Sequence, residues 1–140
     1  MAVRFFNHDT RYRVRGRRKL RDWFDLVIRE EGAKAGAINI ILCQDDYLAE
    51  LNFKYLKHKT LTDIITFPYE HPDGMLDGDI FISLPRVKEN AKKYGTTTEN
   101  ELHRVMIHGI LHLTGQGDKT DTEKGIMTRK EDMYLTFLEC

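Results

Sequence analysis

The residues best suited to chemistry lie between positions 108 and 118, in the run HGILHLTGQGD. His108 and His112 are four residues apart, so on a helix they lie one turn apart on the same face and can bind one metal ion. Gly115 follows where a helix often ends in a left-handed turn. Asp118 comes three residues later and is a candidate third ligand. This layout is typical of hydrolases in which a bound zinc ion activates water.

The residues next to the two histidines support a metal site but differ from the motif of zinc proteases. The helix is apolar nearly all round, and a buried imidazole needs a partner to offset its desolvation. Gly109 stands where the common zinc-protease motif has a glutamate as general base, so the pattern differs from that motif. Either another segment supplies the general base, or the metal ion itself does most of the activation of its bound water. The alternative is a pair of polar residues on an amphipathic helix, with no ion between them.

The composition predicts a single globular domain over residues 1–140. The chain has 22 basic and 22 acidic residues, and no apolar stretch is long enough to span a bilayer. The first ten residues, MAVRFFNHDT, have no long hydrophobic stretch, so we expect no secretory signal. The two cysteines, Cys43 and Cys140, are far apart in the sequence, so we expect no disulfide framework. We therefore expect a cytoplasmic protein without membrane contact.

Charge is unevenly distributed along the chain. Residues 11–21 read RYRVRGRRKLR, with seven positive charges and no acid. Such a cluster can bind the phosphates of a nucleic acid. The alternative is a solvated basic stretch that leads into a helix.

Hydrophobic periodicity and the positions of glycine and proline predict the elements that carry these residues. Strands are expected at 2–6, 37–43, 62–67 and 79–82, with Pro68 ending the third and a turn-rich loop at 69–78. A helix is expected over 19–31, and others begin near residues 45, 83, 98 and 120. The order is strand, helix, strand, helix, strand, strand and three helices. This order favours an α+β fold, with one small mixed sheet and about five helices packed on it.

Capping residues predict where three helices begin. Ser83 is expected to cap the helix that ends at Gly95 and turns Tyr94 inward. Capping boxes are expected from Thr98 to Glu101, before the histidine-bearing helix, and from Thr120 to Glu123, before the last one. The expected core stripe of the histidine helix consists of Leu102, Val105, Met106 and Leu113. The stripe of the last helix consists of Ile126, Met127, Tyr134, Phe137 and Leu138.

Four stretches of the sequence resemble the YbeY family of bacterial metal-dependent endoribonucleases, which mature ribosomal RNA. Residues 51–55 (LNFKY) and 62–68 (TDIITFP) are similar to the family patterns Leu-Asn-x-x-Tyr-Arg and Thr-Asp-Val-Leu-Ser-Phe-Pro. Residues 78–83 (GDIFIS) are similar to its Gly-Asp-Ile strand. Residues 108–115 (HGILHLTG) match its signature His-Gly-x-Leu-His-Leu-x-Gly.

The resemblance implies a zincin-like fold with one Zn²⁺ in a cleft. It also implies a single-strand-specific endoribonuclease that acts in ribosomal RNA processing, at the 3′ end of the small-subunit RNA, and in ribosome biogenesis. The implied partners are RNA and the small ribosomal subunit, with no DNA expected. Two other functions remain open. One is a non-catalytic ribosome-assembly or RNA-binding protein with a degenerate metal cage, and the other is a zincin-like hydrolase of another substrate, such as a peptide.

Two positions depart from the family pattern. The family binds zinc through three histidines, and an ungapped match places Asp118 at the third, with His108 and His112 at the first two. A one-residue slip would put Lys119 there instead, but a lysine cation is a poor ligand. We therefore predict a site of His108, His112 and Asp118, in which the carboxylate makes Mn²⁺ or another hard divalent ion more competitive.

The second departure is Leu56, which stands where the family has an arginine that is expected to contact the RNA phosphate. Lys57 or Lys59 can supply a point charge in its place, though not the bidentate fork of arginine. We take Lys57 as the candidate. Asp63 has two interpretations: it holds a histidine ligand from behind, or it caps a turn at the start of its strand, which we favour. The strand at 62–67 and the loop at 69–78 are expected to line the cleft.

Overall fold

Four strands form one mixed sheet in the computed structural model, which describes residues 2–56, 62–71 and 73–139. The strand order is β1-β2-β4-β3. The first three of these are parallel, and β3 runs antiparallel to β4 at the edge. The strands are β1 (Ala2–Asn7), β2 (Ala35–Cys43), β3 (Ile64–Tyr69) and β4 (Leu76–Ser83).

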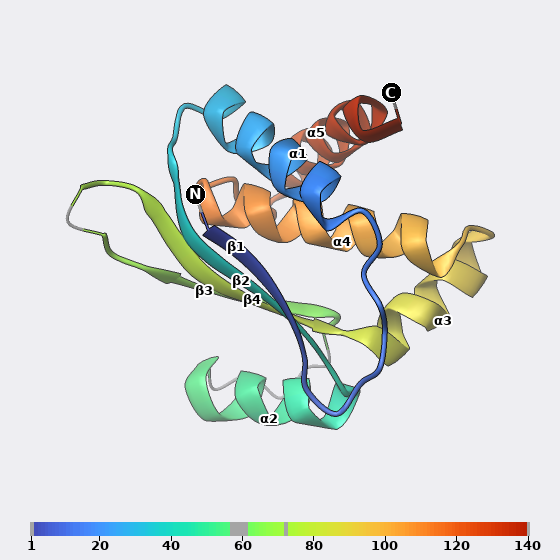
Figure 1. Ribbon diagram of the computed structural model, residues 1–140. Coiled ribbons are helices and arrows are strands. Elements are labelled where there is room, and N and C mark those ends of the chain that lie inside the picture. Colours follow the sequence, from blue (N-terminus) through green and yellow to red (C-terminus); the bar gives the residue numbers. More distant parts are fainter. Residues whose placement is uncertain (1, 57–61, 72, 140) are drawn as a thin grey trace.

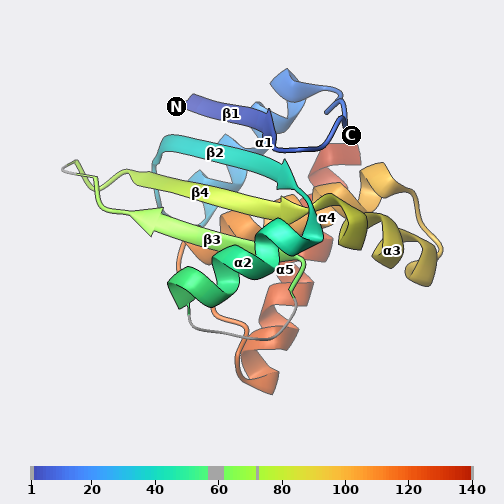
Figure 2. The same cartoon turned by 90° about the horizontal axis from the view of Figure 1, so that it is seen from below.

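Helices cover both faces of this sheet (Figures 1 and 2). Three of them, α1, α4 and α5, lie on one face, α2 lies on the other, and α3 continues from the end of β4. The predicted order of elements and the α+β class are confirmed. In the described residues, no helix has the length and apolar character needed to cross a membrane. The helices are α1 (Arg17–Glu30), α2 (Asp45–Leu56), α3 (Leu84–Tyr94), α4 (Thr98–Leu113) and α5 (Asp121–Glu139).

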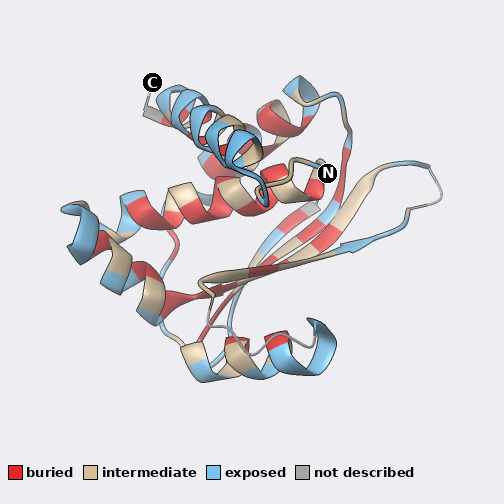
Figure 3. Ribbon diagram, turned by 180° about the vertical axis from the view of Figure 1, so that it is seen from behind, coloured by how far each residue is buried: buried red, intermediate tan, exposed pale blue. Residues whose placement is uncertain are grey.

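The main hydrophobic core lies between the sheet and helices α1, α4 and α5, whose inward faces are buried (Figure 3). The predicted stripe of α4 is confirmed, since Leu102, Val105, Met106 and Leu113 are all buried. A smaller cluster around Leu48 and Ile65 packs under α2. Burial of α4 in the larger core fixes the helix that carries both histidines.

Polar contacts fasten α5 to α1. The Trp23 indole donates a hydrogen bond to the Tyr134 carbonyl oxygen (2.8 Å). The Glu31 carboxylate accepts hydrogen bonds from Lys130 Nζ and from the Tyr134 hydroxyl, each at 2.5 Å. Burial would raise the pKa of Glu31, but these two hydrogen bonds and the lysine charge outweigh it, so the pKa is lowered. The ionised Glu31 therefore stabilises the docking of α5.

Two of the three predicted helix starts are confirmed. The Ser83 hydroxyl caps α3, which ends at Gly95 in the left-handed conformation (φ 68°). Thr120 and Glu123 exchange side-chain to backbone hydrogen bonds at 3.1 Å, as in a capping box. The start of α4 was predicted one residue too late, because the Thr97 hydroxyl, rather than that of Thr98, accepts from the backbone of Asn100 (3.0 Å).

Three further predictions were wrong. Pro68 does not end its strand but pairs with Gly78 within β3, as an edge strand permits. The second strand of this hairpin begins at Leu76, so the loop is shorter than 69–78. Tyr94 and Phe137 are exposed (65% and 44%) rather than inward. Tyr94 is the last residue of α3, beyond its buried Ala91, and Phe137 lies on the outer side of α5, next to the buried Leu138.

Candidate metal centre

Three side chains converge at the carboxyl end of α4. The Nε2 atoms of His108 and His112 face each other at 3.0 Å. Asp118 Oδ2 lies 3.4 Å from the first of these nitrogens and 3.3 Å from the second. The structure thus brings together the three residues predicted as ligands, and together they could hold a metal ion.

The turn after α4 places Asp118 opposite the histidines. Gly115 adopts a left-handed conformation (φ 101°), which favours glycine over residues with a side chain. Its N–H bonds the His112 carbonyl oxygen, and the N–H of Gln116 bonds that of Leu111, each at 3.0 Å. These bonds close the helix end as a Schellman-type turn and reverse the chain. The predicted role of Gly115 is therefore confirmed.

The spacing of the three donor atoms fits a small divalent ion. Ligands about 2.0–2.1 Å from a tetrahedral zinc ion are separated from each other by about 3.3 Å. The observed separations of 3.0, 3.4 and 3.3 Å match that edge length. Three protein ligands leave a fourth position for water or substrate. The donor set of two imidazoles and one carboxylate suits zinc and, because of the carboxylate, manganese.

A second carboxylate orients His108 from behind. Glu131 on α5 is buried, and its Oε2 lies 2.6 Å from His108 Nδ1. Its other oxygen accepts a hydrogen bond from Arg104 Nη1 (2.9 Å), while Arg104 Nη2 bonds Asp132 (2.7 Å). A proton on Nδ1 then satisfies Glu131 and leaves Nε2 as the donor atom for a metal. Sequence analysis missed Glu131 and Arg104, and it considered only Asp63 for this role.

The two histidines have opposite pKa shifts. Burial lowers the pKa of His108, but the hydrogen bond and the charge of Glu131 outweigh it, so the pKa is raised. Burial and the neighbouring His108 lower the pKa of His112. The carboxylates thus offset the cost of burying the His108 imidazole. The surroundings of His112 instead favour its neutral form, which binds metals.

Gly109 lies where the helix touches the sheet. A Cβ atom there would lie 2.8 Å from Ile64 Cδ1 and 3.0 Å from Ile80 Cγ2, closer than such atoms pack. The position that carries the general base in zinc proteases therefore has no room for a side chain. This packing explains the glycine, and it means that any general base in this protein belongs to another segment.

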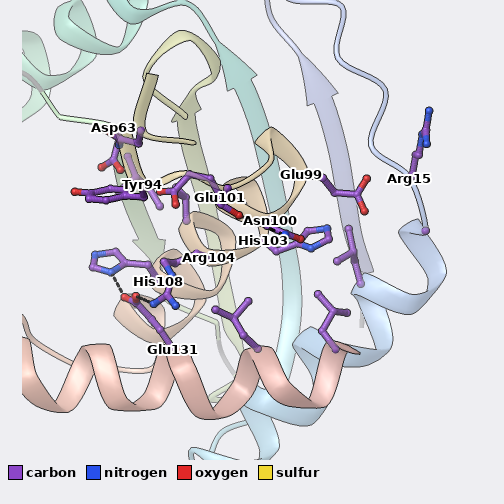
Figure 4. Close-up of a pocket in the computed structure, with 18 of the residues that line it drawn as sticks. Arg15, Asp63, Tyr94, Glu99, Asn100, Glu101, His103, Arg104, His108 and Glu131 are labelled. Carbon is purple, nitrogen blue, oxygen red and sulfur yellow. Dashed lines mark hydrogen bonds and ion pairs between the residues drawn. The ribbon is translucent and has the colours of Figure 1, made fainter. Parts of the chain in front are cut away.

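A cavity of about 980 Å³ opens beside His108 (Figure 4). Asp63 and Ile64 line it, as predicted for their strand, but none of the described residues of 69–78 does. The Asp63 carbonyl accepts a hydrogen bond from the Ser83 N–H (2.9 Å), and it is Glu131 that bonds His108 Nδ1. Lys57, the predicted phosphate contact, lies outside the described residues, as does Lys59.

Part of the basic run reaches this cavity. Arg15 and Lys19 are exposed and line the cavity at the start of α1. Arg17 and Arg21 instead lie over the Phe5 ring, each 5.7 Å from its centroid. Two basic residues of the run thus pack on β1, and two others line the cavity.

The fold and the site define an α+β protein in which one helix and the turn after it present a group able to hold a metal ion. The model of the family described as Endoribonuclease YbeY matches residues 5–139. This chain belongs to that family, as its motifs indicated.

Individual relatives agree with this assignment. Endoribonuclease YbeY of Cytophaga hutchinsonii is 46% identical over 135 residues, which cover 96% of this chain and 94% of the relative. That of Flavobacterium johnsoniae is 44% identical over 127 residues, 91% of each chain. A solution structure of a Thermotoga maritima protein matches with a TM-score of 0.64 and 28% identity, over 97% of this chain and 88% of the other.

Proposed function

We propose that this protein is a metal-dependent endoribonuclease that cleaves single-stranded RNA in ribosomal RNA processing. The observation that carries the proposal is the set of three donor atoms, on His108, His112 and Asp118, at the spacing of a tetrahedral zinc site. Membership of the family named Endoribonuclease YbeY supports RNA as the substrate. The small ribosomal subunit is the proposed partner, and the cytoplasm is the proposed compartment.

Each residue of the site has a distinct part in the proposed reaction. His108, His112 and Asp118 hold the ion, and Glu131 fixes the orientation of His108. A bound divalent ion supplies a Lewis acid for the phosphoryl group and activates water near neutral pH. Zinc is the proposed ion. Because Asp118 is an anion, it makes the site more negative than three imidazoles would, and manganese becomes a competitor.

Basic residues near the cavity are the proposed contacts for the RNA backbone. Arg15 and Lys19 face the cavity that His108 lines. Non-specific affinity for RNA depends mainly on neutralising phosphates, so both residues should contribute a salt-dependent part of binding. Lys57 remains a predicted phosphate contact.

The proposal is tested with a single-stranded RNA and with protein stripped of metal and then reloaded with zinc or manganese. Cleavage should require the ion, and His112→Ala should reduce it at least about 100-fold because a metal ligand is lost. His8→Ala, a change just after β1 and outside the site, is the matched control. RNA that is bound but not cut with any divalent ion would refute the enzymatic proposal and favour a non-catalytic RNA-binding protein.

A protease panel run with the same samples addresses the remaining alternative. The absence of space for a glutamate at Gly109 disfavours peptide hydrolysis. Metal-dependent cleavage of peptides but not of RNA would overturn the proposal.

A further inference from the structure

Of the three proposed ligands, His108 lines the cavity, which extends from this residue along α4. It follows the exposed side of α4 from His108 back toward Asn100, and a helix rises about 1.5 Å per residue, so these positions lie about 12 Å apart along the axis. Helix α3 contributes Tyr94 and Asn90 to its wall. Figure 4 shows the Tyr94 ring on the same side of the cavity as His108. The space meets the metal centre at His108, so it can hold a part of the substrate next to the part that reacts there.

The end of the cavity near His108 is less favourable for phosphate than the end at Arg15 and Lys19. Asp63, Glu101 and Glu131 all line it near His108. Glu101 is buried, and burial raises its pKa; the charge of Arg104 opposes this, and the charges of Asp63 and Glu131 raise the pKa further. Phosphates would be repelled by these carboxylates, whereas an uncharged base would not. At this end a strand should thus turn its bases inward, while its phosphates should lie toward Arg15 and Lys19 at the other end.

Tyr94 offers such a base a stacking surface. Its side chain is 65% exposed. Among the described residues, no aromatic ring packs against it, and Lys93 Nζ lies 5.6 Å from its centroid. Aromatic rings that line a channel for single-stranded nucleic acids stack on bases with little sequence preference. Asn90 and Asn100 on the same cavity can both donate and accept hydrogen bonds.

We propose that the cavity is a nucleobase subsite, in which Tyr94 stacks on a base of the single-stranded RNA next to the bond to be cut. The inference rests on the proposed function, because it takes RNA as the substrate. It assigns Tyr94 to substrate binding and leaves the metal centre unchanged.

The subsite is tested by measuring how the whole chain binds a short single-stranded RNA that contains 2-aminopurine, in a buffer with a metal chelator. Because the ion is removed, the measurement does not depend on cleavage. Tyr94→Ala should weaken binding at least about fivefold and abolish the quenching of 2-aminopurine that stacking causes. Tyr94→Phe keeps the ring and should restore both. Phe137→Ala removes another exposed ring (44%), on α5, that does not line the cavity, and it is the matched control.

Cleavage kinetics of the metal-loaded protein separate this inference from the proposed function. The Tyr94→Ala loss should appear mainly as a higher KM. If Tyr94→Ala binds RNA as tightly as the wild type, or if Phe137→Ala weakens binding equally, the subsite is refuted even when cleavage is normal. If RNA binding depends on Tyr94 but no metal supports cleavage, the subsite stands and the enzymatic proposal fails.

Discussion

Replacing Glu131 by alanine should weaken metal binding at a centre that Glu131 itself does not ligate. Its carboxylate lies 2.6 Å from His108 Nδ1, and its side chain is only 9% exposed, so water cannot fully replace it. Loss of such a partner frees the imidazole to rotate and to change tautomer. Partners of this kind contribute about 10–100-fold in metal affinity, which corresponds to about 1.4–2.7 kcal/mol.

The assay is competition for zinc with a chromophoric chelator, under conditions in which the variant is folded. Stability should also fall by about 1–3 kcal/mol because Arg104 loses a buried partner, so urea unfolding is measured in parallel. In the metal-free wild type, nitrogen-detected NMR should place the neutral His108 proton on Nδ1. The alanine variant should show a mixture of tautomers, which a purely structural defect would not produce.

Two matched variants sharpen this test. Glu131→Gln keeps an acceptor for Nδ1–H but loses the charge, so its affinity should fall between those of the wild type and the alanine variant. Asp132→Ala removes the other partner of Arg104. The Asp132 side chain is 59% exposed, so its loss should change metal affinity by less than about twofold. If a folded Glu131→Ala protein binds zinc as tightly as the wild type, the reasoning is wrong.

Three other changes have defined outcomes. Gly109→Ala should destabilise the protein by about 1–3 kcal/mol in urea unfolding because the new methyl group meets two isoleucines. The control, Gly125→Ala, adds a methyl group in open space on α5 and should be neutral or stabilising. Equal losses of stability in the two variants would contradict the packing argument. Glu31 has a lowered pKa, so its stabilisation is present above its ordinary value of 4.5 and is lost as pH falls. Glu31→Gln should therefore reduce the loss of unfolding free energy as the pH falls. Glu30→Gln, a change at an exposed neighbour, should leave this pH dependence as it is in the wild type. If Glu31→Gln lowers the unfolding free energy equally at every pH, this explanation is wrong. Asp118→His should shift the competition between zinc and manganese toward zinc, and an unchanged preference would show that residue 118 is not a ligand.

Much of the fold could be predicted because its signals are local. Ser83 and Gly95 bound a helix through their own backbone and side-chain chemistry, and the Thr120–Glu123 pair does so over three residues. His108, His112 and Asp118 were also found together because they share one helix and one turn. The expectation of a single domain over 1–140 remains a prediction.

The residues that sequence analysis missed meet only in three dimensions. Glu131 is 23 positions from His108 and lies on another helix, so no spacing rule connects them. One signal was present, because Glu131 falls on the same helical stripe as Met127 and Tyr134, which are buried. A charged residue in an apolar stripe indicates a buried partner. Tyr94 was assigned to the core because periodicity cannot tell where along a helix the packed neighbours end.

Pro68 has a consequence for how copies of this protein behave at high concentration. It lies within β3, at the edge of the sheet, where exposed N–H and C=O groups can recruit a strand from another molecule. A proline has no N–H to offer, so it fits only where the missing donor would face outward. The outer border of β3 is thereby interrupted near its end, and a second chain cannot extend the hydrogen-bond ladder through it. The same residue that belongs to the family motif thus limits pairing with a second chain at the β3 edge of the sheet.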